Sequence, residues 1–203
     1  MTGFPQDQLA EALAALKKGG VILFPTDTVY GLGCAVESPE ATRRIYDLKG
    51  RPPGQPLQIL IAEPPLARRY AKNISSGLWG ILESLWPGGL TALLPAVDGL
   101  PTAVVGPKGT VGLRAPDFPP LQSLLSAAGG AIAATSANLS GQPPACRMED
   151  VPEEIIRQVD FVLDAGALPD RPASTVVDFT VDPPRVIRAG AISKDRLAEF
   201  GVE

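Results

Sequence analysis

Two charged side chains that could bind a phosphate follow the end of a predicted helix, in residues 47–52. Gly50 and Pro52 interrupt helical geometry, so Lys49 and Arg51 are predicted to lie in an extended turn and to point the same way. An ammonium beside a guanidinium is typical of a polyphosphate site, because the first acts as a point charge and the second as a bidentate donor. The alternative is a solvated basic turn.

A second segment carries hydroxyl groups at alternate positions. Residues 24–33 read FPTDTVYGLG and follow a short apolar run. Side chains two residues apart share a face in an extended chain. Thr26, Thr28 and Tyr30 would then present three hydroxyls to one surface, before a glycine-rich turn at residues 31–33. The alternative is an ordinary turn with surface threonines.

Small polar residues also follow the apolar run 131–134 and recur in residues 173–178. At the end of a strand, such residues place hydroxyls, amides and backbone N–H groups where a ligand can approach. Ser136, Asn138 and Ser174 are therefore candidate ligand-binding side chains. The alternative is turn capping by serine and asparagine.

The composition excludes several kinds of chemistry. The sequence has no histidine and only two cysteines, Cys34 and Cys146. Histidine-dependent nucleophile systems, histidine-ligated metals and a four-thiolate zinc site are thus excluded. The remaining reactive groups suit phosphate and carboxylate substrates. No segment fits GxxxxGK[ST], and residues 31–33 lack the third glycine of a dinucleotide loop.

The charge is unevenly distributed along a chain whose net charge is -4. Residues 43–72 are rich in lysine and arginine, whereas residues 149–170 are rich in aspartate and glutamate. The net charge does not indicate a general nucleic-acid coat. Two readings stay open: two solvated faces of opposite sign, or a basic groove for an anion.

Hydrophobic spacing and turn residues predict the elements that position these side chains. The chain of 203 residues is predicted to fold as a single domain, 1–203, of class α/β (α+β), with a twisted mixed sheet flanked by helices. No apolar run has the roughly 18 residues of a membrane span, and no secretory signal is recognisable, so a cytoplasmic location is expected. Helices are predicted at 9–16, 39–48, 64–71, 76–85, 119–127 and 193–200, and strands at 21–24, 57–62, 90–94, 110–114, 131–135, 161–163, 175–179 and 185–187.

Taken together and in this order, the segments resemble the YrdC-like family, the threonylcarbamoyl-AMP synthases, over about residues 19–190. Each motif is weak alone, and the ordered set is specific. The motifs are PTDTVYGLG at 25–33, KGRP at 49–52 with Pro56 and Leu57, WPG at 86–88 with Leu90 and Thr91, residues 111–116, SANLSG at 136–141, STVVD at 174–178, and Ile187, Arg188 and Gly190.

This resemblance implies a basic concave groove and an L-threonylcarbamoyladenylate synthase, a nucleotidyltransferase. Such an enzyme condenses L-threonine, bicarbonate and ATP, with Mg²⁺, to threonylcarbamoyl-AMP and pyrophosphate. The product would pass to threonylcarbamoyl transferase proteins that modify transfer RNA. Two alternatives remain: a non-catalytic module that binds double-stranded RNA or tRNA, and a paralogue that adenylates another carbamate.

The resemblance also assigns expected roles to individual residues, with no metal ligand among the protein side chains. The expected catalytic set is Lys49, Arg51, Ser136 and Asn138; the ATP contacts are Lys49, Arg51, Thr110, Asn138, Cys146 and Arg188; and the threonine contacts are Thr26, Tyr30, Arg114, Ser136 and Ser174. Cys34 is expected in the core and Cys146 on a loop that borders the nucleotide site.

Five positions depart from the pattern of many relatives and bear on substrate affinity and identity. Leu60 stands where many relatives carry a histidine, and some relatives carry a lysine at Gln55 and a histidine at Phe118. Cys146 replaces a hydroxyl residue, and Ala173 ends a segment that is usually Gly-x-Glu.

Overall fold

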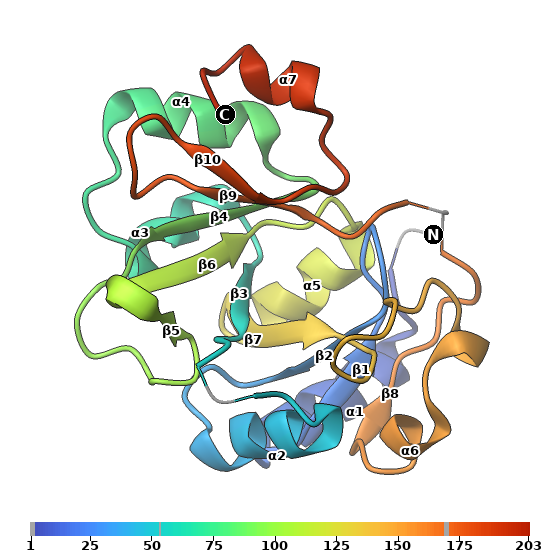
Figure 1. Cartoon of the computed structure of the whole chain (residues 1–203). Coiled ribbons are helices and arrows are strands. Elements are labelled where there is room, and N and C mark those ends of the chain that lie inside the picture. Colours follow the sequence, from blue (N-terminus) through green and yellow to red (C-terminus); the bar gives the residue numbers. More distant parts are fainter. Residues whose placement is uncertain (1–2, 53, 169–170) are drawn as a thin grey trace.

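The structure, a computed structural model, describes residues 3–52, 54–168 and 171–203. Within these ranges ten strands form one mixed sheet with helices against both faces, which confirms the predicted class (Figure 1). The strands are β1 (Ile22–Phe24), β2 (Gly31–Cys34), β3 (Gln58–Ile61), β4 (Leu90–Pro95), β5 (Val105–Gly106), β6 (Thr110–Arg114), β7 (Ala131–Ser136), β8 (Phe161–Val162), β9 (Thr175–Asp178) and β10 (Arg185–Arg188).

The helices connect these strands across both faces. They are α1 (Gln6–Lys17), α2 (Pro39–Lys49), α3 (Ala67–Tyr70), α4 (Ser76–Leu85), α5 (Pro119–Ala127), α6 (Glu153–Ile156) and α7 (Lys194–Ala198), with 3-10 turns η1 (Pro64–Leu66), η2 (Pro107–Gly109) and η3 (Met148–Asp150). Ser38 caps α2 and Ser193 caps α7, each by accepting a hydrogen bond from a backbone N–H. Serine is a favoured residue at this position, because its hydroxyl satisfies a backbone N–H that has no partner within the helix.

The order of strands in the sheet is β10-β9-β4-β6-β3-β7-β2-β1-β8, and β5 pairs with β6 outside this path. Three neighbouring pairs are parallel, namely β1 with β8, β3 with β6 and β4 with β9, and the other pairs are antiparallel. Segments far apart in sequence therefore lie side by side in the centre of the sheet.

Alternation along the strands builds one core on each face. In β3, Ile59 and Ile61 belong to the larger core, whereas Leu60 faces the smaller one. The smaller core is closed by apolar residues of α1 and α5. The larger core includes residues of α2, α4 and α7, and Figure 1 shows α4 and α7 together beside the β9–β10 end of the sheet.

The predicted glycine-rich turn at residues 31–33 is wrong, because these residues form β2. The glycines have a packing role there. A Cβ atom at Gly33 would lie 2.8 Å from the ring of Phe24, and one at Gly31 would lie 3.1 Å from the same ring. Both residues leave room for a buried aromatic ring on the neighbouring strand, which turn propensities do not reveal.

Candidate active site

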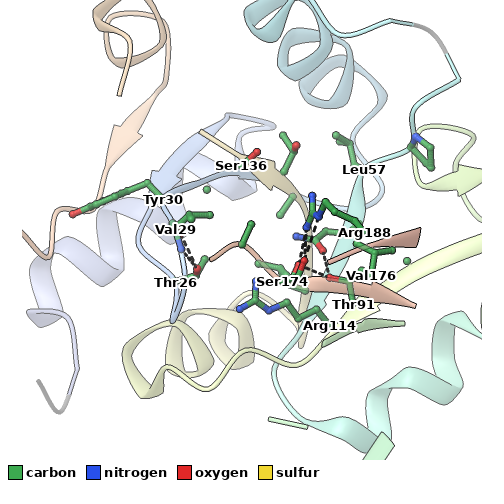
Figure 2. Close-up of a pocket in the computed structure, with 18 of the residues that line it drawn as sticks. Thr26, Val29, Tyr30, Leu57, Thr91, Arg114, Ser136, Ser174, Val176 and Arg188 are labelled. Carbon is green, nitrogen blue, oxygen red and sulfur yellow. Dashed lines mark hydrogen bonds between the residues drawn. The ribbon is translucent and has the colours of Figure 1, made fainter. Parts of the chain in front are cut away.

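A cavity of about 220 Å³ opens on the sheet face that also carries the smaller core (Figure 2). Alternate residues of the central strands form its floor, and Phe24, Leu60 and Ala134 belong both to this lining and to the smaller core. The cavity therefore lies on the same face of the sheet as α5. Its polar lining comprises Thr26, Arg51, Gln58, Thr91, Arg114, Thr135, Ser136, Ser174 and Arg188.

Three guanidinium groups and no carboxylate lie in the lining formed by the described residues: those of Arg51, Arg114 and Arg188. Burial lowers the pKa of Arg188, and the charges of Arg114 and Arg51 lower it further. The three cations thus interact repulsively across the cavity. An anionic ligand would relieve this repulsion, so the electrostatics favour phosphate or carboxylate groups.

Arg51 is held at the rim by the chain that follows α2. Its Nε donates to the carbonyl of Gln55 at 2.9 Å, and its Nη2 donates to the carbonyl of Pro56 at 3.0 Å. Its Nη1 lies 3.3 Å from the hydroxyl of Thr135. These bonds orient the guanidinium into the cavity and leave donors for a ligand.

Lys49 occupies a different environment from the one predicted. It is the last residue of α2, the left-handed Gly50 (φ 55°) follows it, and only 2% of it is exposed. Its Nζ donates to the carbonyls of Ser136, at 2.5 Å, and of Asn138. Burial, followed by the charge of Arg51, lowers the pKa of Lys49 to about 8. The predicted extended turn is therefore wrong. Lys49 instead stabilises the loop after β7 through its bonds to these two carbonyls.

The loop after β7 divides the expected catalytic set into two pairs. Ser136 lines the cavity, and its hydroxyl donates to the side-chain oxygen of Asn138. Asn138 is buried, and its amide donates to the carbonyls of Leu139 and Gln142 at 2.9 and 2.7 Å. Arg51 and Ser136 thus face the cavity, whereas Lys49 and Asn138 hold the surrounding backbone.

Arg114, on β6, forms a buried ion pair. Its Nη2 lies 2.6 Å from Oδ1 of Asp27, and the two side chains are 3% and 5% exposed. Further donation goes to the hydroxyl of Thr28 at 3.0 Å and to the carbonyl of Gly88 at 3.1 Å. Because Asp27 neutralises Arg114, the net positive charge of the cavity resides on Arg51 and Arg188.

A chain of hydrogen bonds crosses the cavity wall formed by Arg188, Ser174 and Thr91 (Figure 2). Nη2 of Arg188 lies 2.8 Å from the carbonyl and 3.1 Å from the hydroxyl of Ser174. The hydroxyl of Ser174 lies 2.8 Å from that of Thr91, which donates to Gln58 at 2.9 Å. Both hydroxyl residues are buried, so these bonds fix the polar groups of the wall.

The segment after β1 is bent and not extended. The hydroxyl of Thr26 donates to the carbonyl of Val29 at 2.7 Å and accepts from the backbone N–H groups of Thr28 and Val29. Thr26 still lines the cavity, but the hydroxyl of Thr28 binds Arg114. The prediction of three hydroxyls on one extended face is wrong, because the Thr26 side chain closes a tight turn.

Tyr30 directs its hydroxyl away from the Arg188–Ser174 wall (Figure 2). That oxygen lies 2.7 Å from both Oδ1 of Asp164 and the carbonyl of Gly166. Burial and Asp164 raise the pKa of Tyr30 to about 12. The hydroxyl of Tyr30 fastens the loop after β8, while the remainder of the residue lines the cavity.

Four of the six expected ATP contacts lie outside the cavity lining: Lys49 and Asn138, described above, and Thr110 and Cys146. The hydroxyl of Thr110 donates to the carbonyl of Pro107 at 3.1 Å, and Sγ of Cys146 lies 4.0 Å from the carbonyl of Thr28. Their contacts with ATP stay predictions. Cys34 is buried in the core as predicted, and burial raises its pKa to about 12. Neither cysteine forms a disulfide with any described residue.

The five positions that depart from the family pattern have unequal relevance to the cavity. Leu60 and Ala173 line it directly. Gln55 supplies a carbonyl that accepts from Arg51 and Tyr46. Phe118 packs edge-on against Phe4, with ring centroids 6.3 Å apart, and Cys146 lies beside Thr28.

Sequence reasoning missed four polar residues of the site: Asp27, Gln58, Thr91 and Thr135. Asp27 and Thr91 stand within the quoted motifs, but nothing there assigned them a partner. Gln58 is two residues from Leu60 on β3, and period-two spacing could have placed it on the same face.

The described residues contain no group of three or more His, Cys, Asp or Glu side chains able to hold a metal ion. None of their helices is long and apolar enough to cross a membrane.

Known proteins are similar to this chain in sequence and in fold over most of its length. The model of the Sua5/YciO/YrdC family, described as "Telomere recombination", matches residues 14–190. The threonylcarbamoyl-AMP synthase of Bacillus subtilis is 35% identical over 191 residues, which are 94% of this chain and 55% of that relative. The chain thus spans about half the length of this relative.

Two solved structures share the fold over nearly the whole of this chain. The crystal structure of P. abyssi Sua5 complexed with L-threonine superposes with a TM-score of 0.91 at 30% identity, covering 98% of this chain and 60% of that one. The crystal structure of E. coli YciO gives a TM-score of 0.85 at 29% identity, covering 93% of this chain and 92% of that one.

Proposed function

The chain belongs to the Sua5/YciO/YrdC family, and from this premise we propose that it condenses L-threonine, bicarbonate and ATP to threonylcarbamoyl-AMP and pyrophosphate. The name of the Bacillus relative and the threonine complex of P. abyssi Sua5 support the proposal. The chain would then be a nucleotidyltransferase that works in the cytoplasm. Its product would supply the threonylcarbamoyl transferase proteins that modify transfer RNA.

The observation that carries the proposal is the cavity with three arginines and no lining carboxylate among the described residues. All three substrates bear anionic oxygens, and they must be held together against their mutual repulsion. Arg51 and Arg188 supply the net charge, and the neutral Arg114–Asp27 pair supplies oriented donors. The volume of the cavity, about 220 Å³, is below the roughly 300–1,000 Å³ of drug-sized pockets. This volume suits an amino acid, with the nucleotide lying towards the opening.

The proposed reaction has two bond-forming steps. The amine of threonine attacks the carbon of bicarbonate, which forms the C–N bond of a carbamate and releases water. A carbamate oxygen then attacks the α-phosphorus of ATP, and the bond to the bridging oxygen breaks as pyrophosphate leaves. Negative charge builds on the phosphoryl oxygens in the second step, where positioned cations lower the barrier most.

The chain's own residues position and neutralise these groups. Arg51 would bind the phosphates, and Ser136, which also lines the cavity, would offer a hydroxyl at the end of β7. Lys49 is mainly protonated at neutral pH, since its pKa is about 8, and it holds the carbonyls of Ser136 and Asn138. Mg²⁺ would arrive with ATP as part of the substrate, because the described residues that line the cavity offer no carboxylate ligand.

Release of pyrophosphate from Mg–ATP tests the proposal. We expect release to require threonine and bicarbonate together. Serine should support less, and valine should be near background, because a site that binds the hydroxyl rejects its absence strongly whereas a missing methyl costs about 1–3 kcal/mol. Arg51→Gln should reduce turnover by about 10²–10³-fold through lost charge stabilisation, while Arg43→Gln, at an exposed position of α2, should not change it.

Other results would identify a different function. Stronger stimulation by another amino acid would indicate a paralogue that acts on another carbamate. Absence of pyrophosphate release, together with binding of duplex RNA whose affinity falls steeply with salt, would contradict the enzyme and support the RNA-binding module.

A further inference from the structure

Gln58 is a cavity residue whose side chain has one hydrogen bond within the described part of the chain, the one from Thr91. It lies on β3, two residues before Leu60, and faces the same side of the sheet. Its backbone register places it opposite Ala134 of β7. The side chain is therefore central in the floor, between the Arg51 rim and the Arg188 wall.

The hydrogen bond from Thr91 to Oε1 gives the orientation of this amide. Arg188 can only donate, so it donates to the hydroxyl of Ser174. Thr91 gives its single proton to Oε1 of Gln58, so Ser174 must donate to Thr91. Gln58 ends the chain as an acceptor through Oε1. Its two Nε2 protons therefore remain for another partner.

Gly112 lies next to this bridge. It lies on β6, between β3 and β4, so the bond from Thr91 to Gln58 passes above it. A Cβ atom at Gly112 would lie 3.3 Å from Leu93, 3.6 Å from Thr91 and 3.7 Å from Gln58. The missing side chain leaves the space over the strand open to the amide and to a ligand.

We propose that the Nε2 donors of Gln58 bind the carboxylate of the amino-acid substrate and help to select it. The neighbours of Gln58 on the floor are Leu60, Leu93, Ala134 and Gly112, which carry no charge. A singly charged carboxylate can accept hydrogen bonds from an amide N–H and from one guanidinium, and bonds of this charge-assisted kind are strong. This inference rests on the proposed function, since it assumes an amino-acid substrate.

Gln58→Glu tests the proposal with almost no change of shape. The variant can still accept from Thr91, but it presents a carboxylate oxygen in place of the donors. We expect its Kd and KM for threonine to rise at least tenfold, because a hydrogen bond to a charged group is replaced by repulsion. Gln58→Leu removes both the acceptor oxygen and the Nε2 donors, and it should raise the Kd and KM for threonine about tenfold. The KM for ATP should change less than about twofold in both variants.

Gln6→Glu provides the matched control, because it makes the same chemical change at an exposed position on α1. Threonine binding is measured by calorimetry without ATP, and circular dichroism checks that each variant is folded. If Gln58 only supports Thr91, Gln58→Glu will bind threonine like the unaltered protein, which would overturn the inference and leave the proposed function intact. Failure of the unaltered protein to bind threonine would overturn both.

Discussion

Lys49 and Arg51 are two residues apart, yet their different surroundings give them different roles. Arg51 lies at the cavity rim with donors available, whereas Lys49 is enclosed and donates to the carbonyls of the loop after β7. The sequence predicted that both residues matter, through their type and spacing. It could not predict the burial of Lys49, which depends on β7 pairing with β2 and β3 far along the chain.

Lys49→Met should lower the free energy of unfolding by about 1–3 kcal/mol at pH 7, because buried carbonyls would lose their donor. The difference between the two proteins should also depend on pH. The pKa of Lys49 is about 8 in the folded protein and 10.5 ordinarily. Below pH 8 both states of the unaltered protein are protonated at this residue, so its contribution is constant.

Between pH 8 and 10.5 the unfolded state binds a proton that the folded state lacks, and the free energy of unfolding therefore rises with pH. We expect the advantage of the unaltered protein over Lys49→Met to grow across this range. Urea denaturation of both proteins at pH 7, 8, 9 and 10 measures it. A difference that is flat or shrinks above pH 8 would show that Lys49 does not have a lowered pKa.

The elements carried by strong local signals were predicted well. The bounds predicted for α4, α5 and β6 agree with the structure, since proline, serine and glycine mark their ends. β2 was missed because Gly31 and Gly33 have turn propensity, and their close packing against the ring of Phe24 and against β7 leaves no local signal. The predicted helix 64–71 divides into η1 and α3, and α6 and β5 lacked a recognisable signal.

Gly190 decides how the segment after β10 approaches β9. A Cβ atom there would lie 2.2 Å from the carbonyl oxygen of Ala173 and 2.6 Å from the carbonyl carbon of Ser174. Gly190→Ala must shift this backbone, so we expect it to lower the free energy of unfolding by about 1–3 kcal/mol. It should also weaken threonine binding, because Ser174 and Arg188 would move.

Gly77→Ala is the control, since nothing lies within 4 Å of a Cβ atom at this position of α4. It should raise the free energy of unfolding by about 0.4–1 kcal/mol. Thermal melts and calorimetry with threonine measure both effects. Equal behaviour of the two variants would mean that Gly190 does not determine the position of Ser174.

At the scale of the whole molecule, the cavity gathers residues from Phe24 to Arg188. The sequence predicted a mixed sheet and the identity of many polar residues, but not the strand order that brings them together, because pairing between distant strands leaves no local signal. The ordered set of motifs supplied part of that information through resemblance.

The structure also shows where the basic residues of segment 43–72 lie. Several residues of the basic segment 43–72 pair with acids on the surface: Arg44 with Asp160, Arg69 with Glu37 and Lys72 with Asp98. Such exposed pairs contribute about 0–1 kcal/mol each, so this part of the surface is largely solvated. The cavity holds three further guanidinium groups, and its size suits small anions better than a nucleic-acid backbone.

The central claim is best tested by mass spectrometry of the product formed from threonine, Mg–ATP and ¹³C-bicarbonate. The account predicts a threonine–carbamate–AMP adduct that carries the ¹³C atom, formed with one pyrophosphate per molecule and absent when any substrate is omitted. ATP cleavage without ¹³C incorporation, or no adduct while threonine is bound, would contradict it.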